Sequence, residues 1–256
     1  MDKGTDDAFF KARIERTRDP FDGRTMAVIS FDNTSIWRAD DYTPALVDRV
    51  LADDRSATVR VRVTDDKVPV GKWLPYLTYL SLPMSTQKWI RRSDVTIEGS
   101  LFNKTHPYRQ YIRGWLLQAL KAGYGTEYNE ELAVSWINAA EHQGDWISFV
   151  ALCGRTPVGH ITLQPDTQRF INSRTRYSEV IDSLVETRPG ERKGDVESDL
   201  VAAASDWARH RGQDLLGNVV HNKDQDGHGW KIVETLLRKG WKQVETVWTR
   251  AEHIDA

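Results

Sequence analysis

The sequence predicts an α/β fold in which a mixed sheet carries helices on both faces. Amphipathic segments with helical periodicity are interleaved along the chain with short runs of β-branched and apolar residues. Glycines and prolines separate these segments, as they do at turns and at helix ends. Because strands and helices alternate, a layered sheet is favoured over an all-helical or an all-β architecture.

The order of elements is clearest from residue 90 onward. Asn129 precedes an apolar, periodic run and is expected to cap a helix, and the letters GRTP separate the two strands of a hairpin. The expected order is strand, helix, helix, three strands, helix, strand, helix and strand. The ranges are 94–99, 108–123, 129–142, 146–165 for the hairpin, 177–187, 195–210, 214–222, 229–240 and 242–250. Such a sheet is expected to place a ligand crevice at the carboxyl ends of its central strands.

The first 85 residues are expected to form an N-terminal extension or a small α/β subdomain, ahead of a main domain at 86–256. Strands are expected at 27–31 and 58–63, with a helix at 43–54 between them. In the second strand Arg60 and Arg62 share one face, which is expected to be half exposed rather than a basic binding surface. The remaining segments are 1–22, expected to be a charged arm or a short helix, and 68–83, expected to be a packed connector.

Composition narrows the classes of function. A chain of 256 residues suits one large domain or two small ones. Its formal net charge of −2 provides no general attraction to nucleic acid or to a membrane surface. The single cysteine, Cys153, excludes an internal disulfide and a Cys-rich zinc site and fits a reducing compartment. No run is apolar and long enough to span a membrane or to act as a signal peptide, so we expect a cytoplasmic protein with no metal.

Five segments in a fixed order resemble the GNAT N-acetyltransferase superfamily. VALCGRTPVGHITL is similar to the family's second and third strands, and IDSLVETRPGERKG to its fourth strand and pyrophosphate loop. DLVAAASDWARHRG resembles the helix that follows, VVHN the fifth strand, and LLRKGW the end of the fourth helix. The resemblance implies a GNAT-like fold over residues 90–250. It also implies an acyltransferase that moves an acyl group from acetyl-CoA or another acyl-CoA to the amine of a small molecule.

The resemblance also implies where the cofactor would bind. Family members hold the pyrophosphate on backbone N–H groups of a glycine-rich loop at the start of a helix, where the helix dipole favours an anion. In this sequence Asp195 and Glu197 stand where glycines are expected when the segments are aligned from the helix, and Asp195 is expected to be the N-cap. The loop is therefore expected to be degenerate. The implied contacts are Val185, Thr187, Arg192, Lys193, Gly194 and Asn222.

For catalysis the resemblance implies a carboxylate on the fourth strand that removes a proton from the amine, and a backbone N–H that polarises the thioester. The candidates are Glu179, Asp182 and Glu186, of which the first two are preferred. Since Glu179 and Asp182 are three positions apart on a strand, they are expected to face opposite ways, so that only one points into the cleft. Leu236 stands where the family often has a tyrosine that protonates the thiolate. His160 is expected to be a hydrogen-bonded strand histidine rather than a base.

Two alternatives stay open at this point. The acyl donor could be an aminoacyl-tRNA or a carrier protein, and basic residues at 88–92, at 106–113 and at Arg174 and Arg176 could contact tRNA phosphates. The chain could also be a non-catalytic binding module with the same fold. His221 and His228 are expected to be surface histidines of a loop. The sequence leaves the oligomeric state open.

Overall fold

The computed structural model describes most of the chain, in two compact units. One unit is Ser81–Gly217, and the other combines Met1–Leu80 with Asn218–Ala256. A domain boundary near residue 85 stays a prediction. The described residues are 12–18, 25–31, 47–48, 52, 58–64, 73–84, 92–125, 128–167, 175–186, 192–221 and 227–250.

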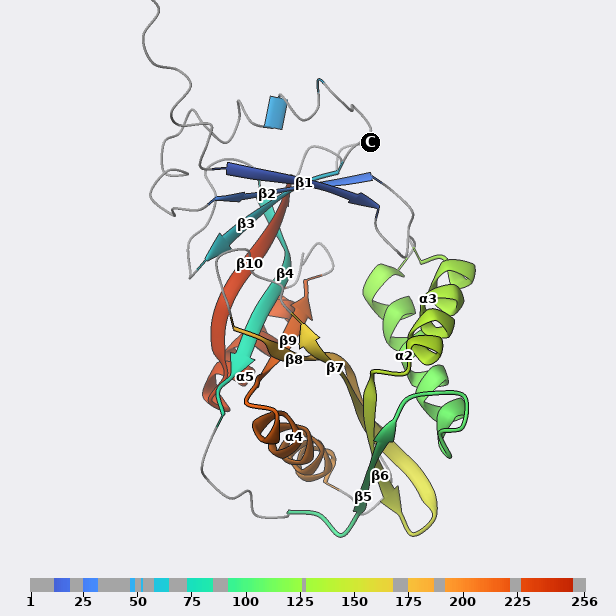
Figure 1. Ribbon diagram of the computed structural model, residues 1–256. Helices are drawn as coiled ribbons and strands as arrows, with labels where there is room; N and C mark the ends of the chain where they lie inside the picture. The colour runs from blue at the N-terminus through green and yellow to red at the C-terminus, as the bar shows by residue number, and fades with distance from the viewer. Residues whose placement is uncertain are drawn as a thin grey trace, which may run out of the picture. The chain divides into compact units, whose positions relative to one another are not determined.

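The unit Ser81–Gly217 is a sheet with helices on both faces, as predicted. Its strand order is β9-β8-β7-β6-β5, in which β8 and β9 are parallel and the other neighbours antiparallel. Helices α2 and α3 lie on one face and α4 on the other (Figure 1). The bounds are β5 Thr96–Leu101, α2 Arg109–Tyr124, α3 Glu130–Gln143, β6 Ile147–Cys153, β7 Thr156–Thr167, β8 Tyr177–Val185, α4 Lys193–His210 and β9 Asp214–Val220.

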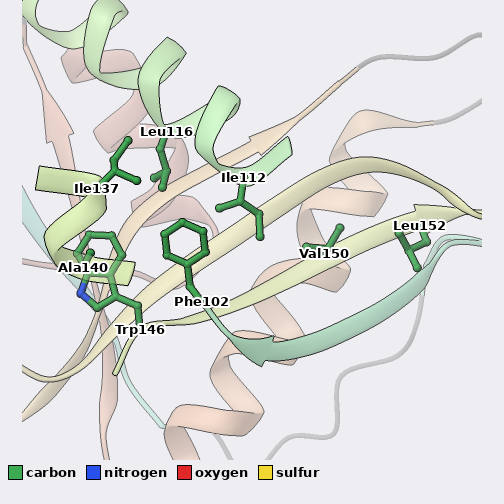
Figure 2. Packing of buried hydrophobic residues seen from close by; sticks show 8 residues of the cluster. All are labelled: Phe102, Ile112, Leu116, Ile137, Ala140, Trp146, Val150 and Leu152. Carbon is green, nitrogen blue, oxygen red and sulfur yellow. The ribbon is translucent and has the colours of Figure 1, made fainter. Parts of the chain in front are cut away.

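The core of this unit lies between the sheet and the helix pair α2–α3 (Figure 2). Its centre is aromatic: the rings of Phe102 and Trp146 stack with centroids 6.3 Å apart, and Trp136 meets Trp146 edge-on at 4.9 Å. Such pairs add roughly 0.5–1.5 kcal/mol each to the free energy gained from area burial. The other buried members are Ile112, Leu116, Ile137, Ala140, Val150 and Leu152.

Local signals fix the ends of these elements. The side chain of Asn129 accepts a hydrogen bond from the backbone N–H of Leu132, which confirms the predicted N-cap of α3. The β6–β7 turn places Gly154 at a φ of 61°, a left-handed conformation that glycine adopts without strain. The predicted hairpin and the β-α-β-α-β order that follows it are both confirmed.

Helix α4 begins earlier than expected. Its N-cap is Arg192 and its first residue is Lys193, so Asp195 lies in the first turn, and the side chain of Arg192 makes no capping hydrogen bond. The prediction that Asp195 is the N-cap was therefore wrong. Its carboxylate still lies near the positive end of the helix dipole, a position that favours an acidic residue.

The second unit is built on strands from both ends of the chain. β1 pairs antiparallel with β2, β2 parallel with β3, and β3 antiparallel with β10, while β4 is the next strand in the order. Its core contains Val59, Val61 and Trp248 with residues of β2. The bounds are β1 Ala12–Arg18, β2 Thr25–Phe31, β3 Thr58–Thr64, β4 Trp73–Leu82, α5 His228–Arg238 and β10 Lys242–Arg250.

Three expectations for the N-terminal region were wrong. The charged segment contains a strand at 12–18, because alternating residues pair along β2 even where few of them are apolar. The supposed connector contains the ten-residue strand β4, in which Pro75 lies near the start. Arg60 is buried with its guanidinium 3.6 Å from the centre of the Tyr76 ring, so this face of β3 is not half exposed.

Strand β7 contains an irregularity at Asp166, which has a φ of 57°. Aspartate tolerates this left-handed conformation better than most residues. Its carboxylate accepts hydrogen bonds from Gln213 (2.6 Å) and Arg211 (2.5 Å). The hydrogen bond from Arg211 is the main reason why the pKa of Asp166 is lowered.

Gly159 lets β7 and β8 approach closely. A Cβ at this position would lie 2.7 Å from the carbonyl oxygen of Leu184 and 3.1 Å from the Cα of Val185. Because these are backbone atoms, they cannot turn away as a flexible side chain would.

We therefore expect Gly159→Ala to lower the free energy of unfolding by about 1–3 kcal/mol, measured by urea denaturation. Gly114→Ala in α2 is the control, since its added Cβ would have no neighbour within 4 Å. It should raise stability slightly, because alanine is the better helix former. A Gly159→Ala protein as stable as the wild type would contradict the close approach.

Candidate functional site

A one-residue bulge in β8 shapes the candidate site. The register pairs Thr162 with Asp182 and Leu163 with Val180, so Ile181 is an extra residue without a partner in β7. Because Gln164 pairs with Glu179, the side chains of Glu179 and Asp182 fall on the same face of the sheet. The expectation that they face opposite ways was wrong, since it assumed a regular strand.

The pairing of β8 with β9 is short. It runs from Tyr177↔Asp214 to Glu179↔Leu216. Within the described residues, the register gives β8 no partner in β9 beyond Glu179, although β8 continues to Val185. The bulge therefore lies just beyond the point where the two parallel strands stop pairing.

The two candidate carboxylates differ in exposure. Glu179 is buried, with 2% of its surface exposed, whereas the Asp182 side chain is 17% exposed. A base must reach a substrate amine, so Asp182 is the better placed of the two. A third acidic residue, Glu186, follows β8 and accepts a hydrogen bond from Trp115 Nε1 at 2.8 Å.

His160 is a hydrogen-bonded strand histidine, as predicted, and it contacts Asp182. Its Nε2 lies 3.1 Å from Asp182 Oδ2, and its Nδ1 lies 3.0 Å from Thr162 Oγ1. The ring stacks on Trp115 of α2, with centroids 5.1 Å apart. The sequence alone gave no sign of this pair, because the diagonal contact between β7 and β8 depends on their register.

The described residues among those expected to bind the cofactor lie at the end of β8 and at the start of α4. Val185 is buried at the end of β8, whereas Arg192, Lys193 and Gly194 are exposed. A Cβ added to Gly194 would meet no protein atom within 4 Å, so the first turn of α4 is open on that side. Thr187 and Asn222 lie outside the described residues.

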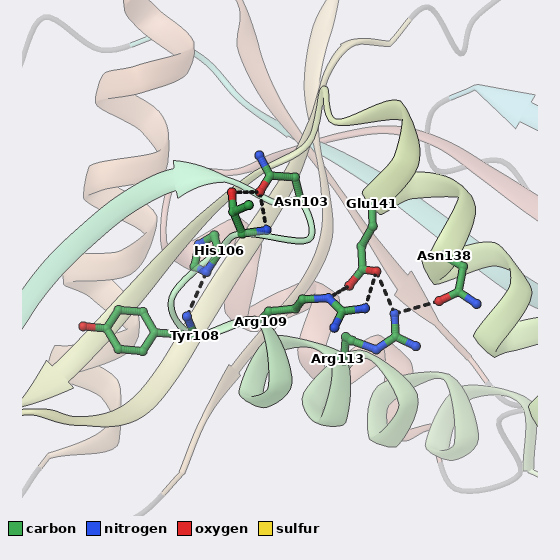
Figure 3. Close-up of polar contacts among 8 residues, drawn as sticks. Asn103, His106, Tyr108, Arg109, Arg113, Asn138 and Glu141 are labelled. Atoms are coloured by element: carbon green, nitrogen blue, oxygen red, sulfur yellow. Dashed lines mark hydrogen bonds and ion pairs between the residues drawn. The ribbon is translucent and has the colours of Figure 1, made fainter.

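Two arginines on the helix that covers this face are engaged with one acid (Figure 3). Arg109 donates to both oxygens of Glu141 at 2.7 and 2.8 Å, and Arg113 lies 3.0 Å from the same carboxylate. Burial by itself would raise the pKa of the Glu141 carboxyl. The hydrogen bonds and charges of the two arginines outweigh burial and lower the pKa below its ordinary value of 4.5.

Of the other basic residues predicted to contact tRNA, only some lie within the described part of the chain. Arg176 is exposed and lies 3.7 Å from Asp166, and the backbone N–H of Arg92 donates to Asp199. Arg174 and residues 88–91 lie outside the described residues.

The remaining candidates belong to the other unit. His221 was expected on the surface but is buried, with its Nε2 2.8 Å from Thr78 Oγ1. The apolar strand residues Val219 and Val220 precede it in the sequence and indicate burial. The polar loop that follows it led to the opposite prediction. His228 is exposed at the start of α5, and Leu236 is half-buried in the same helix.

In the part of the chain that the structure describes, no helix is both long and apolar enough to cross a membrane. The same residues contain no group of three or more His, Cys, Asp or Glu side chains placed to hold a metal ion.

Comparison with known proteins reveals similarity at the level of structure. No protein-family model and no curated protein matches the sequence. A GCN5-related N-acetyltransferase from Sphaerobacter thermophilus superposes with a TM-score of 0.53 at 12% identity, covering 94% of this chain and 76% of that one. The chain has the GNAT fold. At such identity the similarity establishes the GNAT fold alone.

Two further solved structures superpose on the chain with lower TM-scores. A functionally unknown conserved protein from Staphylococcus epidermidis has a TM-score of 0.46 at 12% identity, covering 89% of this chain and 84% of that one. A putative acetyl transferase from Pyrococcus furiosus has a TM-score of 0.42 at 20% identity, covering 58% of this chain and 93% of that one.

The ion pairs of Glu141 predict how stability depends on pH. Since its folded-state pKa is lowered, the pairs stabilise the fold above the unfolded-state pKa, and this stability is lost as the pH falls through the lower folded-state pKa. Glu141→Gln leaves two arginines without their anion, so we expect it to lower the free energy of unfolding by about 3 kcal/mol at pH 7.

The measurement is urea unfolding of both proteins between pH 7 and pH 3. The difference should begin to shrink below about pH 4.5, because the carboxyl then takes up a proton in the unfolded wild type while the paired carboxyl of the folded state resists it. Glu234→Gln, on the exposed side of α5, is the control and should change stability by less than about 0.5 kcal/mol. A difference that stays constant with pH would contradict the ion-pair assignment.

Proposed function

We propose that the protein is an N-acyltransferase that moves an acyl group from acetyl-CoA or another acyl-CoA to the amine of a small molecule. The observation that carries the proposal is the bulge of β8 beside the end of its pairing with β9. It brings a partly exposed carboxylate, Asp182, next to a strand edge that β9 does not pair with in the described residues. The GNAT fold, shared with a GCN5-related N-acetyltransferase, supports the assignment.

The reaction asks for two groups from this strand. The amine nitrogen attacks the thioester carbon, a C–N bond forms, the C–S bond breaks, and the CoA thiolate leaves. Asp182 is the proposed base that takes the proton from the amine. The backbone N–H of Ile181, to which the register assigns no partner in β7, is the proposed donor to the thioester oxygen as negative charge develops there.

The CoA pyrophosphate is proposed to lie at the start of α4. Arg192 and Lys193 supply positive charge, and Gly194 leaves the backbone of the first turn accessible. Val185 is proposed to border the cofactor, and Thr187 and Asn222 are proposed contacts on the resemblance alone. Asp195 in the same turn opposes an anion by charge, which favours either weak CoA binding or a donor carried by tRNA or by a protein.

The base assignment is tested by Asp182→Asn. We expect turnover with acetyl-CoA and a panel of primary amines, followed by thiol release, to fall by about two to four orders of magnitude. Glu179→Gln should leave turnover within about tenfold of the wild type, since Glu179 is buried. Ser183→Ala is the matched control, because Ser183 is exposed and pairs with Ile161, on the opposite face. Unchanged turnover in Asp182→Asn would remove Asp182 as the base.

The donor site is tested by Asp195→Asn. Two like charges roughly 6 Å apart in water repel by ~0.7 kcal/mol, so removing one should tighten CoA binding by about threefold in titration calorimetry. Asp206→Asn, near the other end of α4, is the control and should not change the affinity. Weaker binding in Asp195→Asn would mean that this carboxylate supports the site. CoA that binds neither protein would instead favour a carrier-bound donor or a non-catalytic module.

A further inference from the structure

Behind Asp182 lies a row of polar side chains that no water reaches. His160, Thr162 and Ser148 all have an exposed surface of 0%. Thr162 Oγ1 lies 3.0 Å from His160 Nδ1 and 2.8 Å from Ser148 Oγ. The row therefore runs from Ser148 through Thr162 and His160 to Asp182, across three neighbouring strands, and only its last member is exposed.

The hydrogen bonds of this row fix where the protons lie. An ionised carboxylate only accepts, so the ring nitrogen that faces Asp182, Nε2, must carry a hydrogen. In the neutral ring the other nitrogen, Nδ1, then accepts from the Thr162 hydroxyl, whose oxygen in turn accepts from Ser148. Each donor points along the row toward Asp182. The opposite tautomer would set a nitrogen lone pair against the carboxylate and lose a buried hydrogen bond.

Within the described part of the chain, the contacts of the ring hold it in place and include no cation. The face of Trp115 stacks on the imidazole, with 12° between the ring planes, and Trp115 is itself tied to Glu186. The charged group that contacts the ring is the Asp182 carboxylate, and Glu186 lies beyond Trp115. Arg109 and Arg113 of α2 are engaged with Glu141.

We propose that His160 is a positioning residue for Asp182, with its tautomer set by the carboxylate and its other ring nitrogen satisfied by Thr162. The imidazole N–H holds Oδ2, so that Oδ1, which makes no hydrogen bond within the described residues, is the oxygen left for the amine. Asp182 keeps one orientation until it takes the proton of the substrate. The inference rests on the proposed role of Asp182 as the base.

The tautomer is measured directly by ¹⁵N NMR of the histidine rings in the full chain, without substrate. We expect His160 at pH 8 to be neutral with its hydrogen on Nε2. Thr162→Val removes the hydroxyl donor at nearly constant shape, but the carboxylate still requires the hydrogen on Nε2, so the tautomer should be kept. A wild-type ring that carries a hydrogen on Nδ1 at pH 8, in either charge state, would overturn the proposal.

Kinetics with acetyl-CoA and the fastest amine of the panel test the positioning. His160→Phe keeps a buried ring but loses the N–H donor, so kcat should fall about a hundredfold while both KM values stay within twofold. His160→Gln offers an amide N–H to Asp182 and should recover kcat to within about tenfold of the wild type. Equal losses in the two variants would show a packing role only and overturn the proposal, as would a wild-type kcat in His160→Phe.

The two proposals fail in different ways. If Asp182→Asn keeps its turnover, the base assignment fails, and the positioning role fails with it. If Asp182→Asn loses turnover but His160→Phe does not, only the inference about His160 fails. Thermal unfolding of each variant shows whether a loss of kcat comes from a loss of the fold, and the wild-type NMR measurement needs no variant.

Discussion

Ile181 is one residue more than β7 can pair with, and β8 accommodates it as a bulge between Val180 and Asp182. Every other feature of the candidate site depends on this change of register. Without it, Asp182 would face α4 rather than α2, and its contact with His160 would be lost. The bulge also leaves Ile181 without a β7 partner at the level where β8 and β9 stop pairing, so that its backbone and the Asp182 carboxylate lie close together.

Charge is distributed unequally over the face that α2 and α3 cover. Asp182 of β8 contacts the buried imidazole, whereas the arginines of α2 are neutralised by Glu141 on α3 (Figure 3). Because a buried carboxylate needs a partner, the ion pairs of Glu141 link α2 to α3. Trp115 of α2 can therefore stack on His160 while the charges of Arg109 and Arg113 on the same helix are neutralised by Glu141.

The fold was predictable from the sequence where periodicity and turn chemistry agree. The hairpin around Gly154 and the helix capped by Asn129 are local structures, and their signals lie within a few residues. Strand β1 was missed because charged residues lie on both of its faces, so that the two faces differ little in hydrophobicity. Strand β4 was missed because Pro75 suggested a connector.

The candidate site was less predictable because it depends on contacts distant in sequence. The positions of Glu179 and Asp182 were identified, but the face that each occupies depends on a bulge that no periodicity reveals. The His160–Asp182 contact spans 22 positions and follows from the same register. The start of α4 was misplaced because Asp195 is an excellent N-cap type, and residue type alone cannot locate the first turn.

Asp166 shows how narrow the choice of residue can be even on a surface. Its backbone is left-handed, which glycine would adopt at no cost, yet glycine would give up the hydrogen bonds from Gln213 and Arg211. A longer acid could reach those donors but would tolerate the backbone less well. The backbone and the two donors at this exposed corner therefore favour aspartate and its amide, since few other side chains combine a short polar group with a left-handed backbone.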